Sequence, residues 1–384
     1  MKLLAALVIT STHLLSLPAM AAYGTPFDGW GFVQDDWQVV CDNTLTCRAA
    51  GYTEEGQLET PASILLTALP EVVIPKAQVQ FLSETSEQSF TDVKLWLNGE
   101  NAGNLTSDDD GYTYDLNPQQ ITYLINRARL NTKIEIKAGG ETWPISDKGM
   151  SAVLLKLDEV QGRVGTPMAL VSKNTPNRQV PKVAKPKPVI KKAYAYSEND
   201  KKQLDSKTLT HFQAKIDTWV NIDSGQLMGS EDVMGECELV NPKSESSMSL
   251  ARYADNLPNW TFTPIDANHT LASHLCWRGA YNEAYGYWLI DHAKPSKLQL
   301  ITTAGNEYSD GEIWAIHKDR GIGDCWNHTG WVWSGQTFDK SEQSSTGLCR
   351  GFAGGAWSLP TYISEVVERV NMKSGTVKNE NKLQ

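Results

Sequence analysis

The feature that most constrains this chain is an N-terminal export signal followed by six cysteines. Lys2 precedes a mostly apolar run, Leu3–Leu17, and Ala19-Met20-Ala21 forms a small-x-small cleavage pattern. We therefore predict a signal peptide at 1–21 and an exported mature protein, periplasmic or secreted. The apolar run is too short and too interrupted for a membrane-spanning helix of about 20 residues, and no later stretch is long enough.

Export makes the cysteines interpretable, because disulfides persist in an oxidising compartment. An even number of cysteines allows every sulfur to pair, and the sequence spacing favours three pairs. These are Cys41–Cys47, Cys237–Cys276 and Cys325–Cys349. The alternative is a metal site or a redox thiol pair, but the chain has no Cys-x-x-Cys and no His-Glu-x-x-His motif. We expect no metal and no cofactor.

The length of 384 residues suggests two domains, and a change in composition marks the boundary. Residues 172–192 contain four prolines and seven basic residues but no acidic one, which is typical of an extended, semi-rigid linker. We predict domains at 22–171 and 193–375, with a flexible tail at 376–384.

The two predicted domains are acidic and the linker is basic, and these charges limit the kinds of partner that the protein can bind. Residues 23–171 carry 10 basic and 21 acidic side chains, and residues 193–384 carry 17 and 24. A formal charge of −10 argues against nucleic-acid binding, which needs a basic face. The basic linker is either simply solvated or in weak contact with an anionic envelope surface.

The N-terminal domain is predicted to be mainly β, with one or two helices. Turn residues at 42–45 separate two β-like runs, so a Cys41–Cys47 bond would fix the register of a hairpin. Further strands are expected at 63–68, 78–82, 93–97 and 133–138. Helices are expected at 118–130, where Asn117 is a suitable N-cap, and at 150–157.

The C-terminal domain is predicted to open with a helix at 199–220, to continue in short strands and to end in a helix near 359–370. It holds nine of the 13 tryptophans. Trp331 and Trp333 alternate, so their side chains share one side of a strand. The predicted fold class is therefore mainly β (α+β), with two β-rich disulfide-bonded domains joined by a Pro/Lys-rich linker.

Several stretches carry a family resemblance, and they cover nearly the whole mature chain. They are Asp36–Asn43 (DWQVVCDN), Thr46–Tyr52 (TCRAAGY), Cys276 with Gly279–Asn282 (GAYN), Arg320–Cys325 (RGIGDC), Trp331–Phe338 (WVWSGQTF) and Cys349–Gly351 (CRG). Together they resemble the domain-of-unknown-function family 1176 of exported bacterial proteins. Trp326 departs from the small residue that this family resemblance leads us to expect after Gly-Asp-Cys.

The N-terminal half also resembles, more loosely, the invasion-associated locus B family. The Trp–Cys opening and Gly149–Ala152 (GMSA) carry that likeness. It implies a periplasmic or surface β-domain. Neither resemblance implies catalytic residues.

The most pointed local feature is the segment Arg320–Cys325. Gly321 and Gly323 permit unusual backbone angles, and Cys325 would anchor the segment. One interpretation is a tight turn with a local salt bridge between Arg320 and Asp324. A second is a rigid loop that inserts into a partner, in which case Asp324→Ala should weaken capture at an unchanged melting temperature. A third is catalysis by Asp324.

The aromatic residues also have two interpretations. Large aromatic side chains usually fill the core of a disulfide-bonded β-domain. Alternatively, they line a groove that stacks on glycans, with polar side chains that orient the hydroxyls. The candidate binding residues are Arg320, Asp324, Trp326, Trp331, Trp333, Trp277, Arg278, Tyr281 and Asn282.

Signatures of nucleophilic hydrolases and of phosphate-binding loops are missing from the sequence. The leading hypothesis is a non-enzymatic envelope module that binds a protein or a glycan. One alternative is a cell-wall or glycan-processing hydrolase, which a cleft with two facing carboxylates about 5–9.5 Å apart would favour. Another is a purely structural envelope protein.

Overall fold

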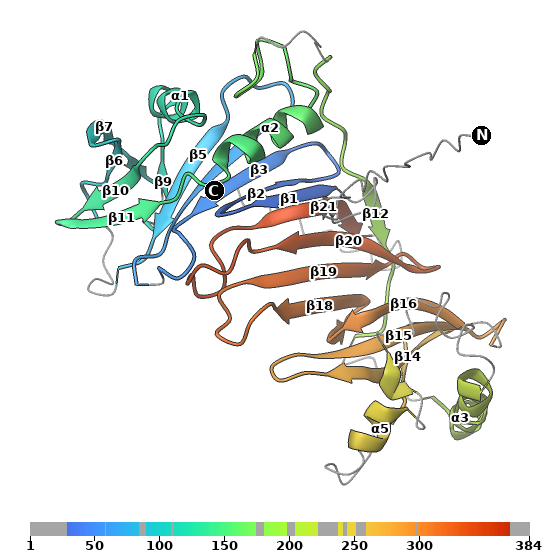
Figure 1. The fold of residues 1–384 in the computed structure, drawn as a ribbon. Coiled ribbons are helices and arrows are strands. Elements are labelled where there is room, and N and C mark those ends of the chain that lie inside the picture. The colour runs from blue at the N-terminus through green and yellow to red at the C-terminus, as the bar shows by residue number, and fades with distance from the viewer. Residues whose placement is uncertain are drawn as a thin grey trace, which may run out of the picture.

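A computed structural model describes residues 29–57, 59–83, 90–108, 111–173, 180–197, 204–221, 237–240, 244–250, 259–295 and 298–368. The predicted signal peptide at 1–21 and the predicted tail at 376–384 lie outside these residues. The described chain is mainly β, with several antiparallel sheets and few helices, which confirms the predicted fold class (Figure 1). In the described part, no helix is long and apolar enough to cross a membrane.

The first part of the chain is built on a seven-stranded sheet with the order β1-β2-β3-β4-β5-β9-β8. Its strands are β1 (Trp30–Gln34), β2 (Trp37–Cys41), β3 (Cys47–Tyr52), β4 (Ala62–Ala68), β5 (Lys76–Phe81), β8 (Thr106–Ser107) and β9 (Tyr114–Asp115). The hairpin predicted around Cys41 and Cys47 is confirmed, because these two residues face each other in the β2–β3 register.

A second sheet has the order β11-β10-β6-β7. Its strands are β6 (Lys94–Leu97), β7 (Glu100–Asn104), β10 (Ile134–Ala138) and β11 (Glu141–Ile145). Helix α1 (Pro118–Asn126) begins where the sequence predicts, since the side chain of Asn117 accepts the backbone N–H groups of Gln119 and Gln120. Helix α2 (Met150–Val160) packs on β1, β2 and β3 (Figure 1).

The second part of the chain contains two further antiparallel sheets, with the orders β13-β14-β15-β16 and β17-β18-β19-β20-β21. The first comprises β13 (Thr261–Pro264), β14 (His269–Arg278), β15 (Glu283–Asp291) and β16 (Leu298–Gly305). The second comprises β17 (Glu307–Ser309), β18 (Glu312–Lys318), β19 (Trp326–Trp333), β20 (Phe338–Ser345) and β21 (Leu359–Ile363). Helical elements precede them: α3 (Ser206–Asn221), the 3-10 turn η2 (Glu238–Val240) and α5 (Glu245–Leu250).

The helix predicted near 359–370 is wrong, because the described residues of this range form strands. β21 pairs with β20, and β22 (Glu365–Glu368) pairs in parallel with β12 (Val189–Lys192). Pro360 cannot donate a helical hydrogen bond, and β-branched residues such as Thr361 and Val366 favour strands.

Residues 180–192 of the predicted linker (172–192) hydrogen-bond to both parts of the protein. The amide of Lys182 donates to the carbonyl of Gln161 (2.9 Å), and that of Lys185 donates to Thr44 (3.1 Å). Its last residues form β12, and Lys192 forms an ion pair with Glu312 (2.6 Å). Residues 180–192 are therefore attached to both parts of the protein.

The structure contains three disulfides, and they join the pairs that the sequence favours: Cys41–Cys47, Cys237–Cys276 and Cys325–Cys349. The first links two neighbouring strands. The second joins the segment before η2 to β14. The third joins the start of β19 to the segment that follows β20.

One hydrophobic cluster draws residues from both parts of the chain. Val40 and Tyr52 face away from α2 and pack against Phe352, Trp357 and Leu359. The opposite face of β2 carries Trp37, Val39 and Cys41, which pack in the main core together with α2. β2 is buried along its whole length because both faces are covered, and its one polar side chain, Gln38, donates to the hydroxyl of Tyr52 (2.7 Å).

Candidate functional site

The segment Arg320–Cys325 forms a loop that is fixed by internal contacts. The carboxylate of Asp324 accepts hydrogen bonds from the Nε of Arg320 (2.6 Å), from its Nη2 and from the amide of Gly351 (2.7 Å). Asp324 is only 2% exposed. Its carboxylate therefore supports the loop from inside and does not face a partner, whereas the side chain of Arg320 stays 39% exposed.

The electrostatics of the loop agree with this arrangement. Burial alone would raise the pKa of Asp324, but the hydrogen bonds from Arg320 and Gly351 outweigh it and hold the pKa below its usual value. The same contact raises the pKa of Arg320. Both groups are therefore charged at neutral pH, and the predicted local salt bridge is present.

The turn between β14 and β15 docks onto this loop. The side-chain amide of Asn282 donates to the carbonyl of Lys318 (2.7 Å) and accepts from its N–H (3.1 Å). The hydroxyl of Tyr281 donates to the carbonyl of Asp319 (3.2 Å), and its ring packs against Gly321. Arg278, on the same turn, is exposed and pairs with Glu283 (2.8 Å).

The loop also belongs to a series of contacts between the two parts of the chain. Arg320 donates to the carbonyl of Cys349 (3.2 Å), and Asp324 accepts a hydrogen bond from the amide of Gly351, two residues further along the chain. The side chain of Arg350 then donates to the buried carboxylate of Asp36, in the β1–β2 turn (3.1 Å). The loop thus fixes the segment that attaches the last sheet to the first.

The predicted aromatic groove does not form as one surface. Trp326 and Trp333 lie at opposite ends of β19, about 23 Å apart at the usual rise of a strand. Trp326 caps the loop by donating to the carbonyl of Gly323, and Trp333 is fully buried, with Trp331 packed against the same cluster. Trp277 packs against a different cluster, which contains Trp288.

Three groups with metal-ligating atoms lie together among the described residues: Asp319, Cys325 and Cys349. The two sulfurs are joined to each other, and a metal ligand would have to be a thiolate. This arrangement is therefore a disulfide beside an exposed carboxylate, which accepts a hydrogen bond from Asn327.

The contacts of Cys349, Arg350 and Gly351 form the joint between the two parts of the chain. Next to this joint, a cleft of about 860 Å³ lies between the edge of the first sheet and the last sheet. One wall comes from β1, β2 and α2, and the other from β19, β20 and β21. The lining residues are Trp30, Gly31, Phe32, Val33, Gln38, Val39, Val40, Lys156, Asn327, Gln343, Ser344, Ser345 and Thr361. None of these described residues is Asp or Glu, so the described lining of the cleft has no pair of carboxylates.

Two aromatic rings define the apolar wall. Trp30 and Phe32 alternate along β1, their planes differ by 5° and their centroids are 6.1 Å apart. Both are only partly buried. Among the described strands, β1 pairs with β2 alone and is the edge strand of its sheet, so the cleft runs along a strand edge.

Neutral polar groups line the facing wall. Gln343 accepts from Lys340 through its Oε1 (3.3 Å), and Asn327 donates to Asp319 through its Nδ2. The remaining amide nitrogen of Gln343 and amide oxygen of Asn327 have no other partner among the described residues. Ser344, Ser345 and Thr361 add hydroxyl groups.

Sequence reasoning missed this cleft because its walls come from segments about 300 residues apart. None of the candidate binding residues lines the cleft, and Asn327, which does, donates to Asp319, the residue before the Arg320–Cys325 loop. The only local signal is the alternation of Trp30 and Phe32 on an edge strand, which shows one shared face but not what lies opposite.

The fold and the cleft define a β-rich, disulfide-bonded protein whose two parts are joined beside a neutral, aromatic-lined groove. Residues 32–364 match the model of a family described as "Protein of unknown function (DUF1176)", and the chain belongs to this family. No curated protein and no solved structure matches the chain. The comparisons do not extend to the invasion-associated locus B family, so that likeness stays a prediction.

Proposed function

We propose that this protein is an exported, non-enzymatic binding module and that its cleft holds a neutral glycan. The observation that carries this proposal is the pairing of the Trp30 and Phe32 rings with amide and hydroxyl groups on the facing wall. Aromatic faces pack against the C–H surfaces of sugars, while amides and hydroxyls exchange hydrogen bonds with sugar hydroxyls.

The composition of the cleft separates this proposal from a hydrolase. Acid–base cleavage of a glycosidic bond needs two carboxyl groups across the substrate, and the lining residues include none. Lys156 is the single charged residue among the described lining residues, and it already pairs with Glu159 (2.7 Å). The groove therefore favours an uncharged ligand.

The Arg320–Cys325 loop takes a positioning role in this proposal. It contacts Cys349 and Gly351, and Arg350 between them binds Asp36, so these contacts hold the last sheet against the first. They also keep the two walls of the cleft in a fixed position relative to each other. Preorganised walls lower the entropic cost of binding.

A periplasmic location agrees with the three disulfides, which need an oxidising compartment. The exposed linker lysines Lys182, Lys185, Lys187 and Lys191 would add a weak, salt-sensitive contact with an anionic envelope surface.

Isothermal titration of the mature protein with neutral oligosaccharides tests the proposal, with the tetramer of N-acetylglucosamine as first probe. Trp30→Ala should weaken binding by about tenfold or more, because it removes one stacking surface. Trp96→Ala is the matched control, since Trp96 is a half-buried tryptophan of β6 outside the cleft. An equal loss in both variants, or no binding of any neutral oligosaccharide, would contradict the proposal.

A further inference from the structure

The loop between β4 and β5, residues 69–75, carries the densest group of exposed apolar side chains among the described residues. Leu69, Val72, Val73 and Ile74 are between 41% and 55% exposed. Single exposed apolar side chains are common on protein surfaces, but a contiguous group marks a site of interaction. We call residues 69–75 the apolar loop.

Arg163, which follows α2, fixes the shape of the apolar loop from inside. Its side chain is fully buried, and its Nη2 donates to the carbonyl oxygens of Leu69 and Val72, at 3.0 Å for Val72. The amide of Val72 also donates to the carbonyl of Leu69 (3.2 Å), and Pro70 and Pro75 are buried. The exposed apolar side chains therefore belong to a preorganised loop, which lowers the entropic cost of docking.

The turn at the end of α2 also holds the linker. The side-chain amide of Gln161 donates to the carbonyl of Ala68 (2.8 Å), and its backbone carbonyl accepts the amide of Lys182 (2.9 Å). A β-carbon at Gly162 would lie 2.5 Å from the carbonyl oxygen of Val180, so the linker passes close to this turn. In Figure 1, the loop after β4 and the chain after α2 leave the first sheet at the same end, at the top of the view.

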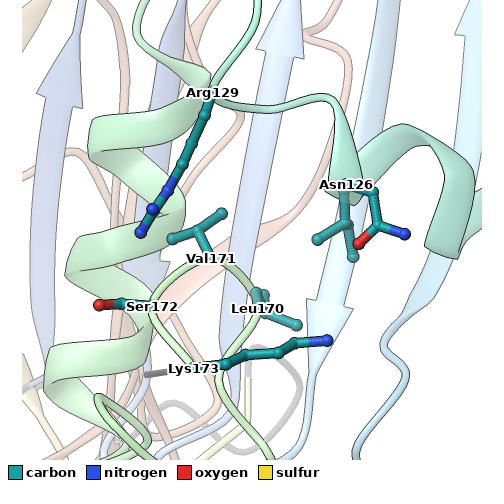
Figure 2. Close-up of a pocket in the computed structure, with 7 residues that line it drawn as sticks. Asn126, Arg129, Leu170, Val171, Ser172 and Lys173 are labelled. Carbon is teal, nitrogen blue, oxygen red and sulfur yellow. The ribbon is translucent and has the colours of Figure 1, made fainter. Parts of the chain in front are cut away.

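The segment between α2 and the linker is anchored as well. The buried carboxylate of Asp158 accepts the backbone N–H groups of Leu170 (2.9 Å) and Val171 (3.1 Å). Figure 2 shows these two residues beside a small pocket, with the charged ends of Arg129 and Lys173 directed away from each other on opposite sides. The pocket therefore offers no shared site for an anion, and the linker starts from a fixed base.

The linker brings positive charge to the same end of the sheet. Lys182, Lys185 and Lys187 are exposed and form no ion pair with any described residue. The apolar loop contains one acidic residue, Glu71, and residues 180–187 contain none. This end of the sheet is therefore basic, although the predicted N-terminal domain as a whole is acidic.

Separated lysines beside an apolar loop match a flat anionic surface better than a single pocket. The backbone of Lys182 is fixed at Gln161, and that of Lys185 is fixed at Thr44 (3.1 Å). At a bilayer surface, apolar side chains enter the boundary between headgroups and acyl chains, while lysines stay level with the headgroups. Each lysine close to anionic lipids adds to the attraction.

We propose that the apolar loop and residues 180–187 form a docking surface for a phospholipid bilayer that contains anionic lipids. Val72, Val73 and Ile74 enter the boundary between headgroups and acyl chains, and the lysines of 180–187 bind the headgroups. The apolar loop thus anchors the weak linker contact that the proposed function includes. The surface rests on the proposed export of the protein but not on the cleft or its glycan.

Flotation of the mature protein with vesicles tests this surface, with phosphatidylcholine alone compared with phosphatidylcholine that contains phosphatidylglycerol. We expect binding to the anionic vesicles, and weaker binding at high salt because the lysines are screened. Val73→Ser should weaken binding by about fivefold or more, because it removes apolar area that the bilayer buries. Ile322→Ser, which changes another exposed β-branched residue, is the matched control and should bind like the parent.

A second pair of variants tests the charges. Lys182→Gln with Lys185→Gln should weaken binding to the anionic vesicles by roughly tenfold or more at low salt, and much less at high salt. Lys94→Gln with Lys133→Gln removes the same charge from two lysines that pair with Asp92 and Glu135, and should bind like the parent. Thermal denaturation establishes that all variants are folded.

Each outcome decides the question. No binding to the anionic vesicles, equal binding to neutral ones, or an equal loss in Val73→Ser and Ile322→Ser overturns the proposal. A dimer in sedimentation equilibrium that Val73→Ser dissociates, without vesicle binding, overturns it in favour of a second copy of the chain. Trp30→Ala should leave vesicle binding unchanged, and Val73→Ser should leave oligosaccharide binding unchanged, so a failure of this proposal is distinct from a failure of the glycan site.

Discussion

The guanidinium of Arg350 donates to the carboxylate of Asp36 across 3.1 Å, although the two residues are 314 positions apart in the chain. Their side chains are 10% and 7% exposed. The pair joins the β1–β2 turn to the segment after Cys349, and in that same segment the indole of Trp357 donates to the hydroxyl of Ser63 (2.7 Å). Long-range contacts of this kind make the two parts of the chain one folded unit at the joint.

We expect Arg350→Met to lower the free energy of unfolding by about 3–5 kcal/mol, because it leaves the carboxylate of Asp36 buried without its charged partner. Urea denaturation measures the change. Adding Asp36→Asn to the same chain should restore part of the stability. Arg278→Met, in an exposed ion pair with Glu283, is the control and should cost about 1 kcal/mol or less. A loss as small at Arg350 would contradict the buried joint.

Asp324→Ala should destabilise the protein by about 1.5–3 kcal/mol, because the buried carboxylate accepts charge-assisted hydrogen bonds from Arg320 and a further bond from Gly351. The sequence alone suggested an unchanged melting temperature for a loop that contacts a partner. Burial of Asp324 reverses that expectation. Thermal and chemical denaturation check it, and an unchanged midpoint would return Asp324 to the contact surface.

The sequence predicted elements that depend on neighbours along the chain. The Cys41–Cys47 hairpin follows from turn residues between two β-like runs, and the start of α1 follows from Asn117, whose side chain caps it. The salt bridge between Arg320 and Asp324 spans four residues, so it could be predicted from the sequence in the same way.

The elements that sequence reasoning missed depend on distant partners. Residues 359–363 are a strand because β20 pairs with them and because Asn43 binds both the carbonyl and the N–H of Ile363. The cleft needs Trp30 on one wall and Gln343 on the other, and no periodicity along the chain brings these together. Tertiary context thus decided both the final strands and the candidate site.

Stability should fall as the pH drops below about 6.5, because burial lowers the pKa of His317 and of His292 from that value. The unfolded chain takes up protons first, so the folded state loses stability from the unfolded pKa down to the lower folded pKa. The free energy of unfolding, measured by urea at pH 7.5 and 5.5, should differ less in His317→Gln than in the parent. The double variant with His292→Gln should differ least, and identical pH differences in all three proteins would contradict the role of these two histidines.

The disulfides should contribute unequally, in the order of the loops that they close. Cys41 and Cys47 are six residues apart, and Cys325 and Cys349 are 24 residues apart. The chain-entropy relation gives about 2.4 kcal/mol for the first loop and about 3.5 kcal/mol for the second. Replacing each pair by serine and measuring urea denaturation should therefore show a larger loss for Cys325 and Cys349.

The Cys325–Cys349 disulfide also holds the joint, since Cys349 precedes Arg350 and its carbonyl accepts a hydrogen bond from Arg320. Losing this disulfide should therefore expose the segment after β20 to limited proteolysis, while losing Cys41–Cys47 should not, because the β2–β3 ladder keeps that hairpin paired. Mass spectrometry of the unreduced mature protein should find no free thiol. Alkylation of two or more cysteines would contradict the disulfides. An equal loss of stability in the two serine variants would show that the Cys325–Cys349 disulfide does not fix the joint.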